Sequence, residues 1–153
     1  MAIIEIPAGP PYGTIPVNAS AIYAAVPHPA APKTSTDLLI DASGARSIQA
    51  LVPIDNLGKM LGADFAELTM SAVTPQACFV NRTSWVSIVP HPQIAGVAQI
   101  NFANHYIAVV GSVADVLKKL QSAPALSRLA TQPKRSRAKS ARKPARKSAR
   151  KSA

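Results

Sequence analysis

The sequence contains a single cysteine, Cys78, in 153 residues. One thiol excludes an intramolecular disulfide and a cysteine-rich zinc site. No apolar run approaches the ~18 residues that cross a bilayer, and the first residues lack the regions of a secretory signal. A glycine-rich phosphate loop, a Gly-x-Ser-x-Gly elbow and paired carboxylates at a repeated position are all missing. We therefore expect a non-enzymatic protein with no cofactor, no metal site and no membrane contact.

Acidic residues are missing from the last twenty positions. Residues 134–153 hold ten basic residues and no acidic one. The whole chain has 17 basic and 7 acidic residues, so residues 1–133 keep seven of each and carry no net charge. The ten are Lys134, Arg135, Arg137, Lys139, Arg142, Lys143, Arg146, Lys147, Arg150 and Lys151. The sequence therefore predicts a neutral body with a polycationic arm (residues 134–153).

The arm repeats a four-residue unit, Ala-Arg-Lys followed by Ser or Pro, from Ala141 onwards. No side chain in it can build a core, so we expect it to be disordered when free. Its composition resembles the basic, alanine-rich tails of linker histones and of bacterial linker-histone-like proteins. The alternatives for such a tail are attraction to a membrane surface, a nuclear localisation signal or a role in solubility.

An arm of this kind binds polyanions by counterion release and reads no base sequence. We therefore expect a sequence-nonspecific nucleic-acid-binding protein, with the ten basic residues as the contacts and DNA favoured over RNA. The alternative is a structural or assembly protein, such as a virion component, whose arm touches packaged nucleic acid. The expected place is the cytoplasm, in association with the nucleoid, or a virion.

The body contains an internal repeat. Val17-Asn18 and Val26-Pro27-His28-Pro29 recur 63 positions later as Val80-Asn81 and Val89-Pro90-His91-Pro92. We interpret residues 1–61 and 64–122 as two copies of one β-rich unit, followed by a linker at 123–133 and the arm.

Each copy is expected to contain five short strands and a closing helix. The strands end at turn residues or prolines, and residues tolerant of positive φ, Gly44 and Asn104, are expected at the hairpin turns. The expected strands are Ala2–Ile6, one ending at Asn18, Ala21–Val26, Asp37–Asp41 and Arg46–Leu51, then Phe65–Met70, one ending at Asn81, Ser84–Val89, Ala98–Phe102 and Tyr106–Val110. The helices follow Pro53, expected at the first helical position, and Ser112, which forms a capping-box pattern with Asp115.

The predicted fold class is α+β, mostly antiparallel β. Units of about 60 residues are marginal alone, and the third strand of each copy is apolar on both faces. We therefore expect the two copies to pack as a pseudo-two-fold pair, with two independent beads as the alternative. The body would then serve as a protein-interaction or dimerisation module for an unknown partner, with homo-oligomers as one outcome.

The second copy resembles a group of small bacterial and phage proteins that includes a short flagellar regulator. The residues that carry this resemblance are Phe79-Val80-Asn81, Val86 with Val89, and the segment 109–117. It implies a compact β-rich unit with a helix, and no activity.

The remaining candidate groups are better explained by structure than by chemistry. His28 and His91 occupy equivalent places and could face one another, but two imidazoles make an incomplete metal site; surface histidines in a strand-ending segment are the simpler explanation. Cys78 is expected to be a buried, inert thiol. The aromatic residues Phe79, Trp85, Phe102 and Tyr106 are assigned to the core rather than to a base-stacking surface, because few basic residues accompany them.

Overall fold

The computed structural model describes residues 2–41 and 45–122. The N-terminal half holds β1 (Ile3–Gly9), β2 (Gly13–Asn18), β3 (Ala24–Pro27), β4 (Thr36–Leu39), β5 (Ser47–Ala50) and α1 (Ile54–Leu61). The C-terminal half holds β6 (Phe65–Met70), β7 (Gln76–Asn81), β8 (Ser87–Pro90), β9 (Val97–Asn101), β10 (Tyr106–Val110) and α2 (Val113–Gln121). Short 3-10 turns, Ala19–Ala21 and Gly62–Asp64, follow β2 and α1.

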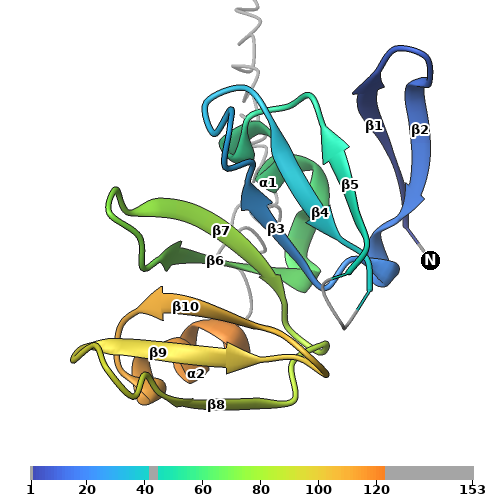
Figure 1. The fold of residues 1–153 in the computed structure, drawn as a ribbon. Helices are drawn as coiled ribbons and strands as arrows, with labels where there is room; N and C mark the ends of the chain where they lie inside the picture. The colour runs from blue at the N-terminus through green and yellow to red at the C-terminus, as the bar shows by residue number, and fades with distance from the viewer. Residues whose placement is uncertain (1, 42–44, 123–153) are drawn as a thin grey trace, which may run out of the picture.

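Eight strands form one antiparallel sheet in the order β5-β4-β3-β7-β6-β10-β9-β8, and β1 and β2 form a separate hairpin (Figure 1). The hairpin lies beside β5, where the Leu51 N–H donates to the Pro7 carbonyl at 2.7 Å. These pairings confirm an α+β fold that is mostly antiparallel β. In the described residues no helix is long and apolar enough to span a membrane.

The two halves are joined head to tail rather than about a two-fold axis. Read from one end, the strands run β2-β1, β5-β4-β3, then β7-β6-β10-β9-β8, so the second five repeat the order of the first five. The junction pairs the third strand of the first half, β3, with the second strand of the other, β7. A two-fold pair would have joined a strand to its own equivalent. The expected pseudo-two-fold packing is therefore wrong.

The two hydrophobic cores share strands, which excludes independent beads. The first core contains residues of α1, β1 and β3, but also Phe65 and Phe79 from the C-terminal half. The second core contains residues of β6, β7, β9, β10 and α2, and also Ala24 from the N-terminal half. Adjacent residues of β3 and of β7 thus face different cores, because side chains alternate along a strand.

Several strand boundaries shift from their expected positions. Residues 19–21 form a 3-10 turn, so the third strand begins only at Ala24, and its counterpart β8 begins at Ser87. Both strands end at the first proline of the Pro-His-Pro segment, as predicted from the missing N–H groups. Gly44 lies outside the described residues, and Asn104 does not adopt a positive φ.

The third strands differ in burial, contrary to the expectation that both would be covered. Strand β3 lies between β4 and β7, and Ala24 and Ala25 are fully buried. Strand β8 lies at the edge of the sheet, where Val86, just before it, is 69% exposed and Val89 is 38% exposed. The apolar pattern therefore marks a buried strand in one half and an open edge in the other.

Both helices begin and end near the expected residues. Ser112 accepts a hydrogen bond from the Asp115 N–H, and the Asp115 carboxylate accepts one in return, which confirms the capping box of α2. Pro53 is the N-cap of α1 rather than its first residue, and Gly62 ends the helix with φ 73°. The buried side chains of the helices are Ile54, Leu57 and Leu61 in α1 and Val116 and Leu120 in α2.

We expect the body to fold without the arm. Within the part of the chain that the structure describes, both cores are built from residues before Gln121, and the uncharged residues of the arm are alanines, serines and one proline. A chain that ends at Gln132 should keep its melting temperature within about 2 °C of the full chain, since no burial is lost. Differential scanning calorimetry measures this, and a drop of many degrees would show that the arm docks on the body.

Candidate nucleic-acid interface

The ten basic residues of the arm, Lys134 to Lys151, lie outside the described residues. The structure does describe the point from which the chain runs toward them. Helix α2 ends at Gln121, and both the N–H and the hydroxyl of Ser122 donate to the Lys118 carbonyl, at 2.9 and 2.6 Å. Lys118 and Lys119 are exposed in its last turn. The chain therefore leaves the body at the negative end of a helix that carries two exposed cations.

Arg82 holds this helix end in place. Its Nη1 donates to the carbonyls of Lys119 and Leu120, at 2.6 and 2.8 Å, and its Nε donates to the Ala63 carbonyl at 3.0 Å. The guanidinium thus satisfies two of the carbonyls that a helix leaves without partners at its C-terminus. Arg82 thus connects the end of α2 to the segment between the two halves.

The described residues near this point carry charges of both signs. A shallow hollow beside α1 and β7 contains Lys59 and Arg82, but Asp55 and Glu67 line it as well. The described residues hold six basic and seven acidic side chains. The excess positive charge that would attract a polyanion therefore lies in the arm, and Lys118 and Lys119 are exposed at the end of α2.

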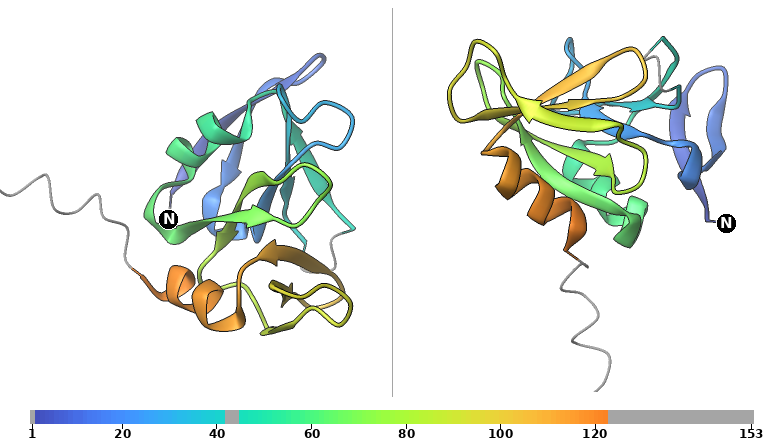
Figure 2. Two further views of the ribbon diagram at one scale, coloured as in Figure 1. Left: turned by 90° about the vertical axis from the view of Figure 1, so that its left-hand side faces the viewer. Right: turned by 90° about the horizontal axis from the view of Figure 1, so that it is seen from below.

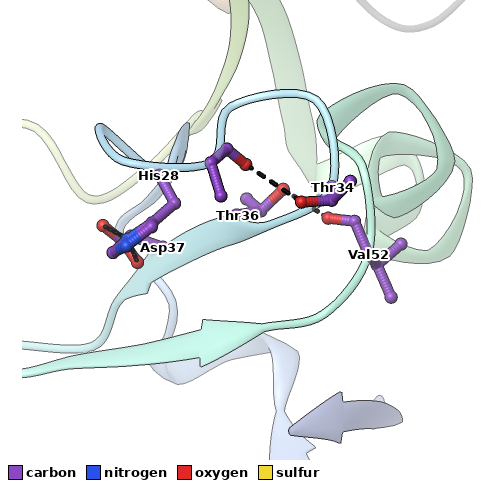
Figure 3. Close-up of polar contacts among 6 residues, drawn as sticks. His28, Thr34, Thr36, Asp37 and Val52 are labelled. Atoms are coloured by element: carbon purple, nitrogen blue, oxygen red, sulfur yellow. Dashed lines mark hydrogen bonds and ion pairs between the residues drawn. The ribbon is translucent and has the colours of Figure 1, made fainter. Parts of the chain in front are cut away.

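The histidines have structural roles in the described part of the chain. Figure 3 shows His28 facing Asp37, whose carboxylate oxygens lie 2.9 and 3.0 Å from His28 Nδ1. The buried Thr36 donates to the Val52 carbonyl at 2.7 Å in the same view. His91 Nδ1 accepts from the Gln93 N–H. His28 and His91 follow β3 and β8, with four strands between them in the sheet, so they do not form a pair. No cluster of three metal-ligating side chains occurs among the residues described.

Cys78 is buried and unreactive, as expected. Its side chain is 0% exposed, and burial raises the pKa of its thiol to about 12, with the negative charge of Glu67 acting in the same direction and Lys119 against it. A thiol that stays protonated at neutral pH is a poor nucleophile.

Of the four aromatic residues assigned to the core, Phe79, Trp85 and Phe102 lie in or against a core, as expected, although they are divided between the two cores. Phe79 packs in the first core, whereas Phe102 is buried in the second with the partly buried Trp85 beside it. Trp85 donates from Nε1 to the Arg82 carbonyl at 2.9 Å. Tyr106 is 55% exposed on β10, so its assignment to the core is wrong. Tyr23 of the N-terminal half meets Phe102 edge to face, at 6.4 Å between ring centroids.

Sequence reasoning treated Asn18 and Asn81 as turn residues, and missed a second role for one of them. Both side-chain oxygens accept from the residue two positions later: Asn18 from Ser20 and Asn81 from Thr83. The Asn81 Nδ2 also donates to the Ile22 carbonyl at 3.1 Å, across the junction of the two halves. The one sequence signal for Asn81 is the repeated pattern of Val-Asn followed two positions later by a hydroxyl residue, Ser20 or Thr83.

The two asparagines form a matched pair for mutation. Asn81→Ala leaves the Ile22 carbonyl without its buried partner and removes the turn bond, so a loss of about 2–4 kcal/mol of stability is expected. Asn18→Ala removes only the turn bond and should cost about 1 kcal/mol. Urea denaturation of both variants measures the difference. Equal losses would show that the bond across the junction contributes nothing.

Comparisons with known proteins give a likeness of fold. No family model matches the chain, and no curated protein matches it. A solved structure, the LytTr DNA-binding domain of a protein from Bacillus cereus described as a methyl-accepting/DNA response regulator, matches with a TM-score of 0.53 and 15% sequence identity. The match covers 78% of this chain and 96% of that domain. The body of this protein is therefore similar in fold to this LytTr domain.

Proposed function

We propose that this protein binds nucleic acid without sequence preference, DNA in preference to RNA, and performs no catalysis. The basic arm supplies the affinity, and the ten residues from Lys134 to Lys151 are its phosphate contacts. The body carries the arm and serves as a protein-interaction or dimerisation module. The observation that carries the proposal is the separation of charge, with a neutral body and every excess cation in the last twenty residues.

Two further observations support a nucleic-acid partner. Lys118 and Lys119 are exposed at the end of α2, the last described element before the arm, and offer two further contacts to a phosphate backbone. The fold is shared with a domain whose title names DNA as its ligand. Since residues 1–133 carry no net charge, the arm rather than the fold is the main contact in this proposal.

The second candidate is an assembly protein whose arm touches packaged nucleic acid. It is favoured by the large apolar residues that are exposed between positions 86 and 110: Val86, Val89, Ile94, Tyr106 and Val110 are each between 38% and 69% exposed. Exposed apolar side chains gathered in one region are typical of protein interaction surfaces. In this case single molecules would bind nucleic acid feebly, and affinity would come from many arms held together.

The test compares the full chain with a chain that ends at Gln132, on duplexes of several unrelated sequences and on matched RNA. The proposal expects the full chain to bind every DNA duplex with similar affinity at low salt, RNA more weakly, and the shortened chain to lose nearly all binding. Fluorescence anisotropy measures each affinity. Strong binding by the shortened chain would place the site on the body, and a marked preference for one sequence would exclude readout through phosphates alone.

A further inference from the structure

The contact between β3 and β7 shows how one half of this fold binds another. Ala24 stands opposite Val80 and Ala25 opposite Phe79. The Asn81 N–H donates to the Tyr23 carbonyl at 2.9 Å, and the Asn81 Nδ2 donates to the Ile22 carbonyl. A strand that ends in asparagine thus pairs with the strand that precedes a Pro-His-Pro segment.

A strand that ends in asparagine and a strand that precedes a Pro-His-Pro segment also occur at the two ends of the molecule, and each has a partner strand on one side only. Strand β8 precedes Pro90-His91-Pro92, and among the described strands it pairs only with β9. Strand β2 ends in Asn18, and its one partner among the strands that the structure describes is β1. The β1–β2 hairpin and β8 lie on opposite sides of the molecule (Figures 1 and 2). The head-to-tail order of the sheet therefore leaves one complementary edge open at each end.

The backbone groups on the open edge of β8 match those that β3 presents to β7. His91 donates its N–H to the Val97 carbonyl, and antiparallel strands alternate inward and outward groups. The N–H and C=O of Ile88 therefore point away from β9. Ile88 lies 63 positions after Ala25, which stands opposite Phe79 in the junction.

The open edge of β2 carries the features of β7, with one exception. Ala19 donates to the Ala2 carbonyl, so the backbone groups of Asn18 and Pro16 point away from β1. The Asn18 side chain has the same turn bond as Asn81. Pro16, 63 positions before Phe79, has no N–H to donate.

We propose that the open edge of β8 binds strand β2 of a second copy of this chain, in the register of the β3–β7 junction. Ser87 then stands opposite Val17 of the next chain and Ile88 opposite its Pro16. The N–H of Asn18 donates to the Val86 carbonyl, and the N–H of Ile88 donates to the Pro16 carbonyl. Each added chain presents a new β8 edge, so this contact builds open chains rather than closed dimers.

Two properties set the strength of this contact. The missing N–H of Pro16 removes one ladder bond, which makes the contact between chains weaker than the internal junction and reversible. The arms add like charge to every molecule, and salt screens that repulsion within a few ångströms at molar concentrations. The exposed Val86 and Val89 lie on or just before the edge strand that the second copy would cover.

The test is sedimentation velocity of the full chain in high salt over a wide range of concentration. The mean mass should rise with concentration beyond that of a dimer. Pro16→Val restores the missing donor and should raise the association constant by about 2- to 10-fold, the value of one net hydrogen bond. Val86→Lys places a charge beside the open edge, at an exposed site where folding is unaffected, and should abolish association.

A matched control is Pro7→Val, which alters a proline in β1, between β2 and β5 rather than at an open edge. It should leave association unchanged. The proposal is overturned if the natural chain stays monomeric at every concentration. It is equally overturned by association that stops at a dimer, or that responds to neither Pro16→Val nor Val86→Lys.

Discussion

Replacing Arg142, Lys143, Arg146 and Lys147 with alanine is expected to reduce the salt dependence of duplex DNA binding by about 3–4 units of slope in a plot of log affinity against log salt concentration. Each phosphate contact releases about 0.9 counterion from B-DNA, so the loss of four contacts reduces the slope by up to about 3–4 units. Affinity at physiological salt should fall by orders of magnitude for every sequence alike, because phosphate contacts carry no base information.

The control variant replaces four basic residues of the body instead of four in the arm. A variant with Lys33, Lys59, Lys118 and Lys119 changed to alanine keeps the arm intact and loses four positive charges as well. It should change the slope by less than half as much, since only Lys118 and Lys119 adjoin the exit of α2. Fluorescence anisotropy titrations at five or more salt concentrations give both slopes. If the body variant had the larger effect, the arm would not be the main contact.

The second large effect is a loss of folding stability, expected from mutations at the contact between α1 and β7. A Cβ added at Gly58 would stand 2.6 Å from Cε1 and Cε2 of Phe79 and closer still to its Cζ. The Phe79 ring lies in the first core, although its strand belongs to the C-terminal half. Gly58→Ala should therefore cost about 1–3 kcal/mol or more by overpacking, and Phe79→Ala about 3–5 kcal/mol by leaving a cavity.

The double variant separates the steric cause from a general helix effect. With Phe79 reduced to alanine the obstacle is gone, and alanine is favoured over glycine inside a helix by about 1 kcal/mol. Gly58→Ala should therefore change from destabilising to stabilising in the Phe79→Ala background. Guanidinium unfolding of the four proteins gives the coupling energy. Additive effects would mean that the ring and the helix do not meet, and two separate transitions would contradict a shared core.

The sequence predicted those parts of the fold that depend on local chemistry. The prolines of the Pro-His-Pro segments end β3 and β8 because they cannot donate to a ladder. Ser112 and Asp115 start α2 through a pattern that needs only four residues. The exposure of Tyr106 could also have been predicted. Side chains alternate along β10, so Tyr106 lies on the face opposite to the buried Ile107 and Val109.

The pairing of β3 with β7 could not be predicted in the same way. The two strands are about fifty residues apart, and nothing in the apolar pattern of Ala24 and Ala25 names a partner strand. The third strands of the two halves have similar sequences, yet β3 is buried and β8 lies at an edge. The difference arises because β7 of the C-terminal half pairs with β3, whereas no strand follows β8 in the sheet of the described residues. The candidate site depends on composition instead, so the prediction of a nucleic-acid-binding arm needs no fold, and its residues lie outside the described part of the chain.

The β3–β7 junction also determines when this chain can fold during synthesis. The hydrogen bond from Asn81 to Ile22 spans 59 residues, and Phe65 and Phe79 complete a core that begins at Ile6. The first sixty residues therefore emerge from the ribosome without the strand that covers β3, and Phe79 must follow before the first core closes. Contacts this distant in sequence slow folding. The nascent N-terminal half keeps apolar surface in water until β7 has been made, the interval in which a chaperone would bind it.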